Sequence, residues 1–213
     1  MLPITLKLKR KSHKEIAYAQ DLIVETLYSF FQRAVIHGGT AIWRCYSGNR
    51  FSEDVDVYIA KDKNKINEMF SSLENRGFLV IKKRIKENSL YSTLRFNRSI
   101  VRLEALFKSM KYPFLKEYEA SDGISINVFT LTPEGLIKEK ISAYLKRRKI
   151  RDLYYIFFLL RYVKDKKSIN KDLKDLIKNF INPIDEQDLK ALIISGPTPT
   201  SKNMLEYIER WAK

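Results

Sequence analysis

Two aspartates that alternate with valines are the residues of this sequence best suited to chemistry. Asp54 and Asp56 stand in the run Asp-Val-Asp-Val-Tyr-Ile, whose period of two predicts a strand over residues 54–59. Residues two apart on a strand point to one face, so the two carboxylates lie side by side. Because like charges repel, such a pair calls for a cation or a proton between them, and oxygen-only ligands suit Mg²⁺ or Mn²⁺.

A glycine pair followed by a threonine precedes these aspartates. Residues 34–37 have the pattern of a short strand that ends at Gly38 and Gly39, and Thr40 opens a predicted helix over residues 40–46. Glycine lets backbone N–H groups approach a ligand closely, and a helix N-terminus attracts anions. We therefore expect nucleotide phosphates at this turn, facing the aspartates, which is the apparatus of phosphoryl or nucleotidyl transfer.

Neither half of this motif is specific on its own. A Gly-Gly pair usually marks a turn, and an isolated Asp-x-Asp is often the polar edge of a strand or part of a loop. An EF-hand is excluded because the third ligand and the glycine that it requires are missing at the right offsets. The order of strand, Gly-Gly-Thr, helix and then Asp-x-Asp on a second strand is what favours a transferase.

Two regions with different patterns must position these residues. The first mixes helical and strand periodicity, and a helical pattern dominates after Thr130. Thr132-Pro133-Glu134 is typical of a helix start, with threonine as N-cap and proline at the first helical position. We predict an α+β protein, with a core domain over residues 1–131 (a mixed sheet with flanking helices) and a helical C-terminal domain over residues 132–213. In the first region we expect helices over 14–33, 40–46 and 62–76, and strands over 34–37, 54–59, 78–85, 90–96, 100–107 and 124–129.

The composition favours a polyanionic partner. The 213 residues include 40 Lys and Arg against 25 Asp and Glu, a net charge of +15. Such a balance most often indicates nucleic acid, although solubility or a lysine-rich genome is the alternative. One cysteine excludes an internal disulfide framework, and the longest apolar run, residues 153–160, is too short to span a bilayer. We expect a cytoplasmic protein without a signal peptide or a membrane partner.

Residues 37–57, HGGTAIWRCYSGNRFSEDVDV, resemble the active-site signature of the polymerase-β-type nucleotidyltransferases. Within that superfamily, GGTA…R…R-F-S-E-D-x-D resembles the AbiEii/AbiGii-type nucleotidyltransferases, which include the MenT-like toxins of toxin–antitoxin systems. The resemblance implies a polymerase-β-like core, Mg²⁺ on the aspartate pair and a nucleoside triphosphate on the Gly-Gly-Thr turn. It also implies an RNA acceptor such as the 3′ end of tRNA, and a cognate antitoxin.

The resemblance further implies a third carboxylate on a later strand. Glu104, in the run Val-Arg-Leu-Glu-Ala-Leu, is the candidate third metal ligand. An acid centred in an apolar strand needs a partner, and the alternative is an ion pair with Arg102 or Arg95.

A second family signature pairs Glu-Lys on one helix with Arg-Asp at the start of the next. It corresponds here to Glu139-Lys140 and Arg151-Asp152. The resemblance implies that Lys140 reaches the triphosphate and that Asp152 orients Lys140 or accepts a proton from the attacking hydroxyl. The alternatives are a solvated lysine and an acid that complements a helix N-terminus. Many relatives carry a further Asp where this chain has Tyr155.

Three residues around the motif complete the expected nucleotide site. Arg44 lies about one turn into the helix after the glycines, close to a bound phosphate. Arg50 pairs with Asp54 or with the nucleotide, and Ser52 stands two residues before Asp54. If Ser52 were phosphorylated, its charge would oppose the carboxylates or capture the metal. We interpret Cys45 as buried helix packing.

These features predict transfer of a nucleoside monophosphate from a triphosphate to a hydroxyl, with release of pyrophosphate. The site is expected in a cleft between the two domains. The basic residues among 138–151, at 82–86 and at 7–14, with Tyr91, Tyr144 and Tyr154, are either nucleic-acid contacts or a solvated surface and core. The alternatives are the same chemistry on a protein or small molecule, and a nucleic-acid-binding relative that has lost catalysis.

Overall fold

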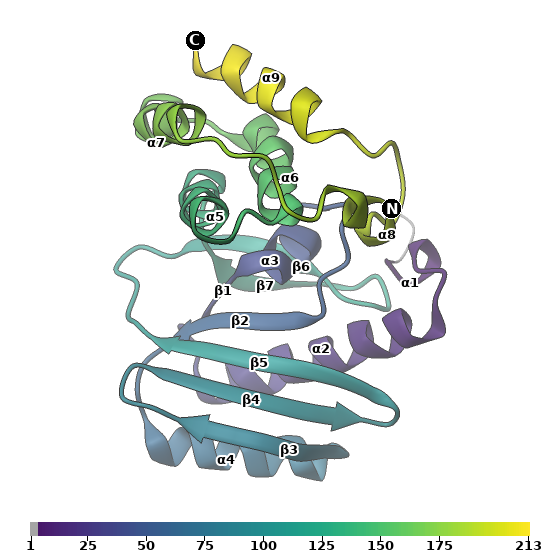
Figure 1. The fold of residues 1–213 in the computed structure, drawn as a ribbon. Helices are drawn as coiled ribbons and strands as arrows, with labels where there is room; N and C mark the ends of the chain where they lie inside the picture. The colour runs from purple at the N-terminus through teal and green to yellow at the C-terminus, as the bar shows by residue number, and fades with distance from the viewer. Residues whose placement is uncertain (1–3) are drawn as a thin grey trace. The chain divides into compact units, whose positions relative to one another are not determined.

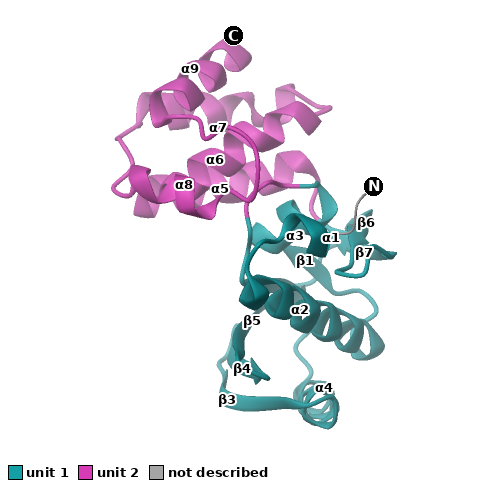
Figure 2. Ribbon diagram, turned by 90° about the vertical axis from the view of Figure 1, so that its right-hand side faces the viewer, with its two compact units in different colours: residues 1–47, 51–130 teal, residues 48–50, 131–213 magenta. Residues whose placement is uncertain are grey.

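The computed structural model describes residues 4–213, and the chain divides into two compact units (Figure 2). The first unit comprises residues 1–47 and 51–130, and the second comprises residues 48–50 and 131–213. Residues 1–3, which begin the predicted core domain, lie outside the described part.

A seven-stranded mixed sheet is the frame of the first unit (Figure 1). Its strands are β1 (Val35–His37), β2 (Asp54–Ile59), β3 (Phe78–Ile85), β4 (Ser89–Phe96), β5 (Ser99–Phe107), β6 (Phe114–Glu119) and β7 (Ser125–Thr130). They lie in the order β3-β4-β5-β2-β1-β7-β6. The pairs β2–β5 and β1–β7 are parallel and the other four are antiparallel.

The helices described in this unit are α1 (Ile4–Lys7), α2 (Lys11–Phe30), α3 (Gly38–Cys45) and α4 (Lys63–Asn75). Figure 2 shows α2 and α4 on the same side of β3, β4 and β5. Side chains alternate between the two faces of a strand. Val55, Leu94 and Leu103 share the side that carries the helices, and all three are completely buried there.

The opposite side of the sheet, which we call the polar face, carries the side chains that could bind a ligand or take part in a reaction. It is defined here by the side chains that alternate with the buried apolar ones on β2, β4 and β5, namely Asp54, Asp56, Tyr91, Thr93, Arg102 and Glu104. The hydrophobic pattern thus fixes which side chains remain available for function.

The second unit is helical. It contains α5 (Pro133–Arg147), α6 (Ile150–Leu159), α7 (Lys167–Lys178), α8 (Leu189–Leu192) and α9 (Ser201–Ala212), with short 3₁₀ turns at Leu160–Tyr162 and Glu186–Asp188. Helix α5 packs on α6 and α7, and α9 packs on α6 and α7. The Thr132 hydroxyl accepts a hydrogen bond from the Gly135 N–H, which is the predicted N-cap. Among residues 4–213, no helix combines the length and the hydropathy of a membrane span.

The predicted fold class, a mixed sheet with flanking helices followed by a helical region, is confirmed. The sequence analysis missed α1 and β6. Strand β6 lies at the edge of the sheet, and for that reason its pattern of buried and exposed residues is irregular. Tyr118 is its one fully buried residue. The glycine pair also differs from expectation, since it forms the first turn of α3 and does not precede the helix.

Arg44 lies in the core of the first unit and not at a phosphate site. Its Nη2 donates to Asp21 Oδ1 at 2.7 Å and to the Ala17 carbonyl at 2.8 Å. Its guanidinium carbon lies 4.3 Å from the Trp43 ring centroid and 5.0 Å from that of Tyr118. The expectation that Arg44 meets the nucleotide is therefore wrong, because its side chain points toward residues of α2 and β6.

Substitution of Arg44 by Met is expected to destabilise the fold by about 3 kcal/mol, because it leaves the Asp21 carboxylate buried without its cation. The measurement is the free energy of unfolding in urea. Arg33→Met, at an exposed arginine, is the matched control and should change the value by less than about 0.5 kcal/mol. Equal losses in the two variants would show that the buried pair is not a structural element.

Candidate active site

The close approach of Gly38 to Asp56 shapes the first part of the site. Gly38 has φ of +69°, and a Cβ built on it would lie 2.2 Å from Asp56 Oδ2. Only glycine fits this position, for both conformational and steric reasons. The Thr40 hydroxyl is buried and donates to the Asp54 carbonyl, so it ties the start of α3 to β2.

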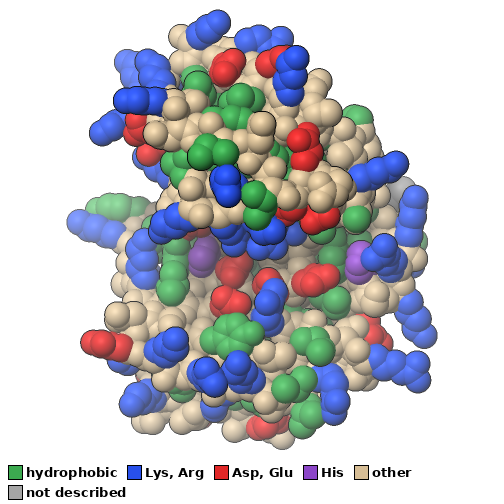
Figure 3. All heavy atoms as spheres, viewed as in Figure 1, with side chains coloured by type: hydrophobic (Ala, Val, Ile, Leu, Met, Phe, Trp, Pro, Cys, Tyr) green, Lys and Arg blue, Asp and Glu red, His purple; other side chains and the backbone are tan. Residues whose placement is uncertain are grey.

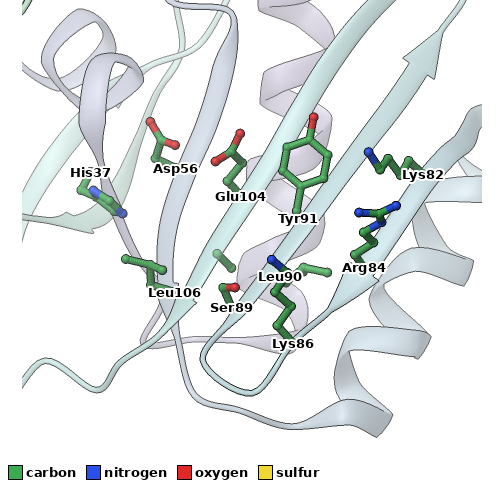
Figure 4. Close-up of a pocket in the computed structure, with 11 residues that line it drawn as sticks. His37, Asp56, Lys82, Arg84, Lys86, Ser89, Leu90, Tyr91, Glu104 and Leu106 are labelled. Atoms are coloured by element: carbon green, nitrogen blue, oxygen red, sulfur yellow. The ribbon is translucent and has the colours of Figure 1, made fainter. Parts of the chain in front are cut away.

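The strand register sets five side chains in one row across the polar face. His37 pairs with Asp56, Asp56 with Glu104, Glu104 with Tyr91, and Tyr91 with Arg84. Directly opposed residues on neighbouring strands point to the same side of a sheet. Figure 4 shows this row, with the carboxylates of Asp56 and Glu104 next to each other.

A second row runs beside the first and contains Asp54. The register pairs Asp54 with Arg102, Arg102 with Thr93 and Thr93 with Lys82. Arg102 Nε and Nη2 each donate to one Asp54 carboxylate oxygen at 2.7 Å. These hydrogen bonds raise the pKa of Arg102, so the guanidinium stays charged. The sequence analysis considered Arg102 as a partner of Glu104, but it binds Asp54.

The electrostatics around Glu104 favour a bound cation. Burial raises the pKa of Glu104, and the charges of Asp56 and Asp54 raise it further. This repulsion between oxygen donors is what a divalent cation relieves. Within residues 4–213, no three His, Cys, Asp or Glu residues form a metal-binding group. The structure therefore brings Asp56 and Glu104 together, while Arg102 holds Asp54.

A pocket of about 460 Å³ extends along the first row. Its charged lining changes from Asp56 and Glu104 to three cations, Lys82, Arg84 and Lys86 (Figure 4). Figure 3 shows acidic side chains over β2 and β5, with Lys and Arg side chains over β3 and β4. The sequence analysis predicted neither this pocket nor this arrangement, which depends on register between distant strands.

In the second unit, Tyr155 brings two expected nucleotide ligands together. The Arg50 Nη1 donates to the Tyr155 hydroxyl, and the Arg50 guanidinium lies 5.2 Å from the ring centroid. Lys140 Nζ also lies 5.2 Å from this centroid. The predicted pair of Arg50 with Asp54 does not form. Arg50 binds the Tyr155 hydroxyl, and Asp54 binds Arg102.

Asp152 does not have the predicted relation to Lys140. Its side chain is completely buried, and both carboxylate oxygens accept hydrogen bonds from Arg147, at 2.7 and 2.8 Å. The Asp152 carboxylate is therefore bound to Arg147, and the predicted contact with Lys140 is replaced by this ion pair. Ser52 is also buried, which argues against its phosphorylation by a kinase.

Comparison with models of protein families identifies the family of this chain. A family model described as "Nucleotidyl transferase AbiEii toxin, Type IV TA system" matches residues 22–204, most of the chain. The chain belongs to the AbiEii family. The resemblance seen in residues 37–57 is thereby confirmed, and the chain is a nucleotidyltransferase of a toxin family.

Two solved structures share the AbiEii-type fold of this chain at low sequence identity. JHP933 from Helicobacter pylori has a TM-score of 0.64 and 19% identity, over 95% of this chain and 93% of its own. MenT4, nucleotidyltransferase toxin Rv2826c from Mycobacterium tuberculosis H37Rv, has a TM-score of 0.64 and 17% identity, over 97% and 90%. A search of curated proteins found no match.

Substitution of Gly38 by Ala is expected to lower nucleotide transfer about 100-fold, because the new methyl group displaces the Asp56 carboxylate from its place. Gly77→Ala is the matched control: Gly77 also has a positive φ, +92°, but its nearest heavy atom would lie 3.8 Å away. Transfer of label from α-labelled nucleotides measures the difference. If both variants keep full activity, the Gly38–Asp56 contact does not shape the site.

Substitution of Arg102 by Gln is expected to tighten Mn²⁺ binding about fivefold, because the cation no longer has to displace a half-exposed ion pair from Asp54. Electron paramagnetic resonance of free Mn²⁺ gives the dissociation constant without any turnover. Arg95→Gln, at an exposed arginine of β4, should leave it unchanged. A constant that stays at the wild-type value in Arg102→Gln would mean that Asp54 does not bind the metal.

Proposed function

We propose that this AbiEii-family enzyme transfers a nucleoside monophosphate from a nucleoside triphosphate to a hydroxyl of RNA, such as a tRNA 3′ end, and releases pyrophosphate. The observation that carries the proposal is the first row of the polar face. It aligns His37 (the residue before the Gly-Gly-Thr turn), two carboxylates and a basic pocket on one sheet. This order of groups suits a triphosphate, a divalent cation and a polyanionic acceptor.

Asp54, Asp56 and Glu104 are the residues that would hold Mg²⁺ or Mn²⁺. A bound cation supplies neutralisation of triphosphate charge and activation of the attacking hydroxyl. Gly38 has no Cβ to collide with the Asp56 carboxylate, and Gly39 and Thr40 carry backbone N–H groups in the first turn of α3. Binding of the cation at Asp54 requires Arg102 to release that carboxylate.

Lys140 and Arg50 are assigned to the triphosphate. Both cations are held at the Tyr155 ring, and among residues 4–213 no carboxylate forms an ion pair with Lys140. Cations that are held in place and not neutralised can stabilise the charge that develops on a leaving pyrophosphate. Asp152 supports this region by holding Arg147.

The net charge of +15 favours RNA over a small molecule as the acceptor. A protein or small-molecule acceptor is the alternative. We place the reaction in the cytoplasm and assign the chain a cognate antitoxin as partner, in line with its toxin family.

The test is incubation with a divalent cation, total RNA and each of the four α-labelled triphosphates. Asp56→Asn and Glu104→Gln are expected to reduce labelling of RNA about 100-fold or more, because each removes a cation ligand. Asp122→Asn, at an exposed aspartate, is the matched control and should retain activity. Thermal unfolding establishes that the variants are folded.

Label in RNA that depends on Asp56 and Glu104 supports the proposal and identifies the nucleotide. Label in a protein or a small molecule contradicts the RNA acceptor and favours the alternative. Labelling by Asp56→Asn at the wild-type rate would contradict the assigned site.

A further inference from the structure

We infer that the single-stranded 3′ end of the RNA acceptor lies along β3 and β4, with its phosphates on Lys82, Arg84 and Lys86 and a base on Tyr91. The inference rests on the proposed function and deepens it, because it assigns a binding surface and a direction to the acceptor. It starts from the pocket in Figure 4, whose basic side begins where the carboxylates end.

A β-bulge aims the basic residues at this pocket. Before it, Val80 pairs with Leu94, a completely buried residue on the helix-covered side of the sheet. After it, Lys82 pairs with Thr93 on the polar face, because the register shifts between Val80 and Lys82. Strict alternation would have placed Val80, Lys82 and Arg84 on the same side. The extra residue turns the two cations toward the carboxylates, as bulges next to active sites do.

Lys83 shows that β3 separates its charges by face. Its Nζ donates to Asn67 Oδ1 at 3.1 Å and lies 4.8 Å from the Phe70 ring centroid, and both residues belong to α4. Lys83 therefore extends toward the helix-covered side, while Lys82 and Arg84 line the pocket. Two cations of one strand face the site, and the cation between them does not.

The positive charge of the pocket is not neutralised by the protein. In the chain from residue 4 onward, no carboxylate forms an ion pair with Lys82, Arg84 or Lys86. All three side chains are exposed. Three neighbouring cations without counterions repel each other, and phosphates of a nucleic-acid backbone relieve that repulsion with release of counterions.

Tyr91 adds a stacking surface between the cations and the carboxylates. The register places it opposite Arg84 on one side and Glu104 on the other. Lys82 Nζ lies 5.2 Å from its ring centroid, so the ring already has a cation beside it. An aromatic ring on a sheet face offers a platform for an unpaired base, and stacking tolerates any base.

The order of groups gives the acceptor its direction. From β3 to β2 the row reads Arg84, Tyr91, Glu104 and Asp56, over three strand spacings or about 14 Å. A strand whose phosphates lie at Arg84 and whose last base lies on Tyr91 brings its terminal hydroxyl to Glu104. A base-paired end does not fit this placement, because its last base is stacked on its own helix.

The test compares two double variants that each remove one lysine and one arginine. Lys82→Ala/Arg84→Ala removes the cations of the pocket, and Lys83→Ala/Arg98→Ala removes an exposed pair that lies outside it. Fluorescence anisotropy of a labelled single-stranded RNA, in EDTA and without nucleotide, gives the dissociation constant at several salt concentrations. The same assay with a labelled triphosphate and Mn²⁺ measures nucleotide binding.

We expect Lys82→Ala/Arg84→Ala to weaken RNA binding and to reduce the slope of log K against log salt by about 1.4, which is two single-strand phosphate contacts. The control should keep the wild-type slope, and nucleotide binding should be unchanged in both. Tyr91→Leu should weaken RNA binding roughly tenfold, and Tyr91→Phe should retain it, because the ring and not the hydroxyl stacks.

Equal slopes in the two double variants would overturn the inference, and so would weaker nucleotide binding with unchanged RNA binding, which would make the cations triphosphate ligands. The proposed function stands in either case if wild-type enzyme labels RNA. If wild-type enzyme labels a protein and not RNA, both the proposed function and the placement of an acceptor end fail. Loss of RNA affinity in the pocket variant alone would then show only an RNA-binding surface.

Discussion

The parallel pairing of β2 with β5 is the constraint on which the site depends. It sets Glu104 opposite Asp56 and Arg102 opposite Asp54, although about 50 residues separate the two strands. A slip by one residue would turn Glu104 to the helix-covered side and Leu103 to the polar face. Burial of Leu103 and Val55 on the helix-covered side, where α2 packs on β5, opposes that slip, so the core holds the register of the proposed site.

The same register places a pair of repelling carboxylates and a carboxylate–arginine ion pair on one face of the sheet. Asp56 and Glu104 raise each other's energy when both are charged, while Asp54 is neutralised by Arg102. A cation that enters this group relieves the first interaction and competes with the second. In the proposed site, affinity for a cation would thus be a difference between two electrostatic terms, and Arg102 would set one of them. Gly38 leaves room for the Asp56 carboxylate itself, because any Cβ at this position would collide with it.

The sequence predicted the local parts of this site and not the partners of its charges. The alternation in residues 54–59 predicted both ends of β2 correctly, and the full pattern over residues 37–57, from the glycine pair to the aspartate pair, identified the family. Arg44 was misassigned because helical spacing does not tell which side of a short helix is buried, and every residue of α3 is buried. The Arg147 partner of Asp152 and the Arg102 partner of Asp54 depend on rotamers and strand register, which a single sequence does not specify.

Protection of the sheet edge is a simpler explanation for the lysines of β3, because charged edge strands resist pairing with other chains. That explanation accounts for charge at the edge, but it does not explain why the charges lie on one particular face of the sheet. The bulge between Val80 and Lys82 is specific in that respect. It interrupts the ladder, which weakens the strand, and its result is that Lys82 and Arg84 share a face with Glu104 and Asp56. A feature that disrupts pairing and concentrates cations beside the carboxylates is better explained by a phosphate ligand than by the edge alone.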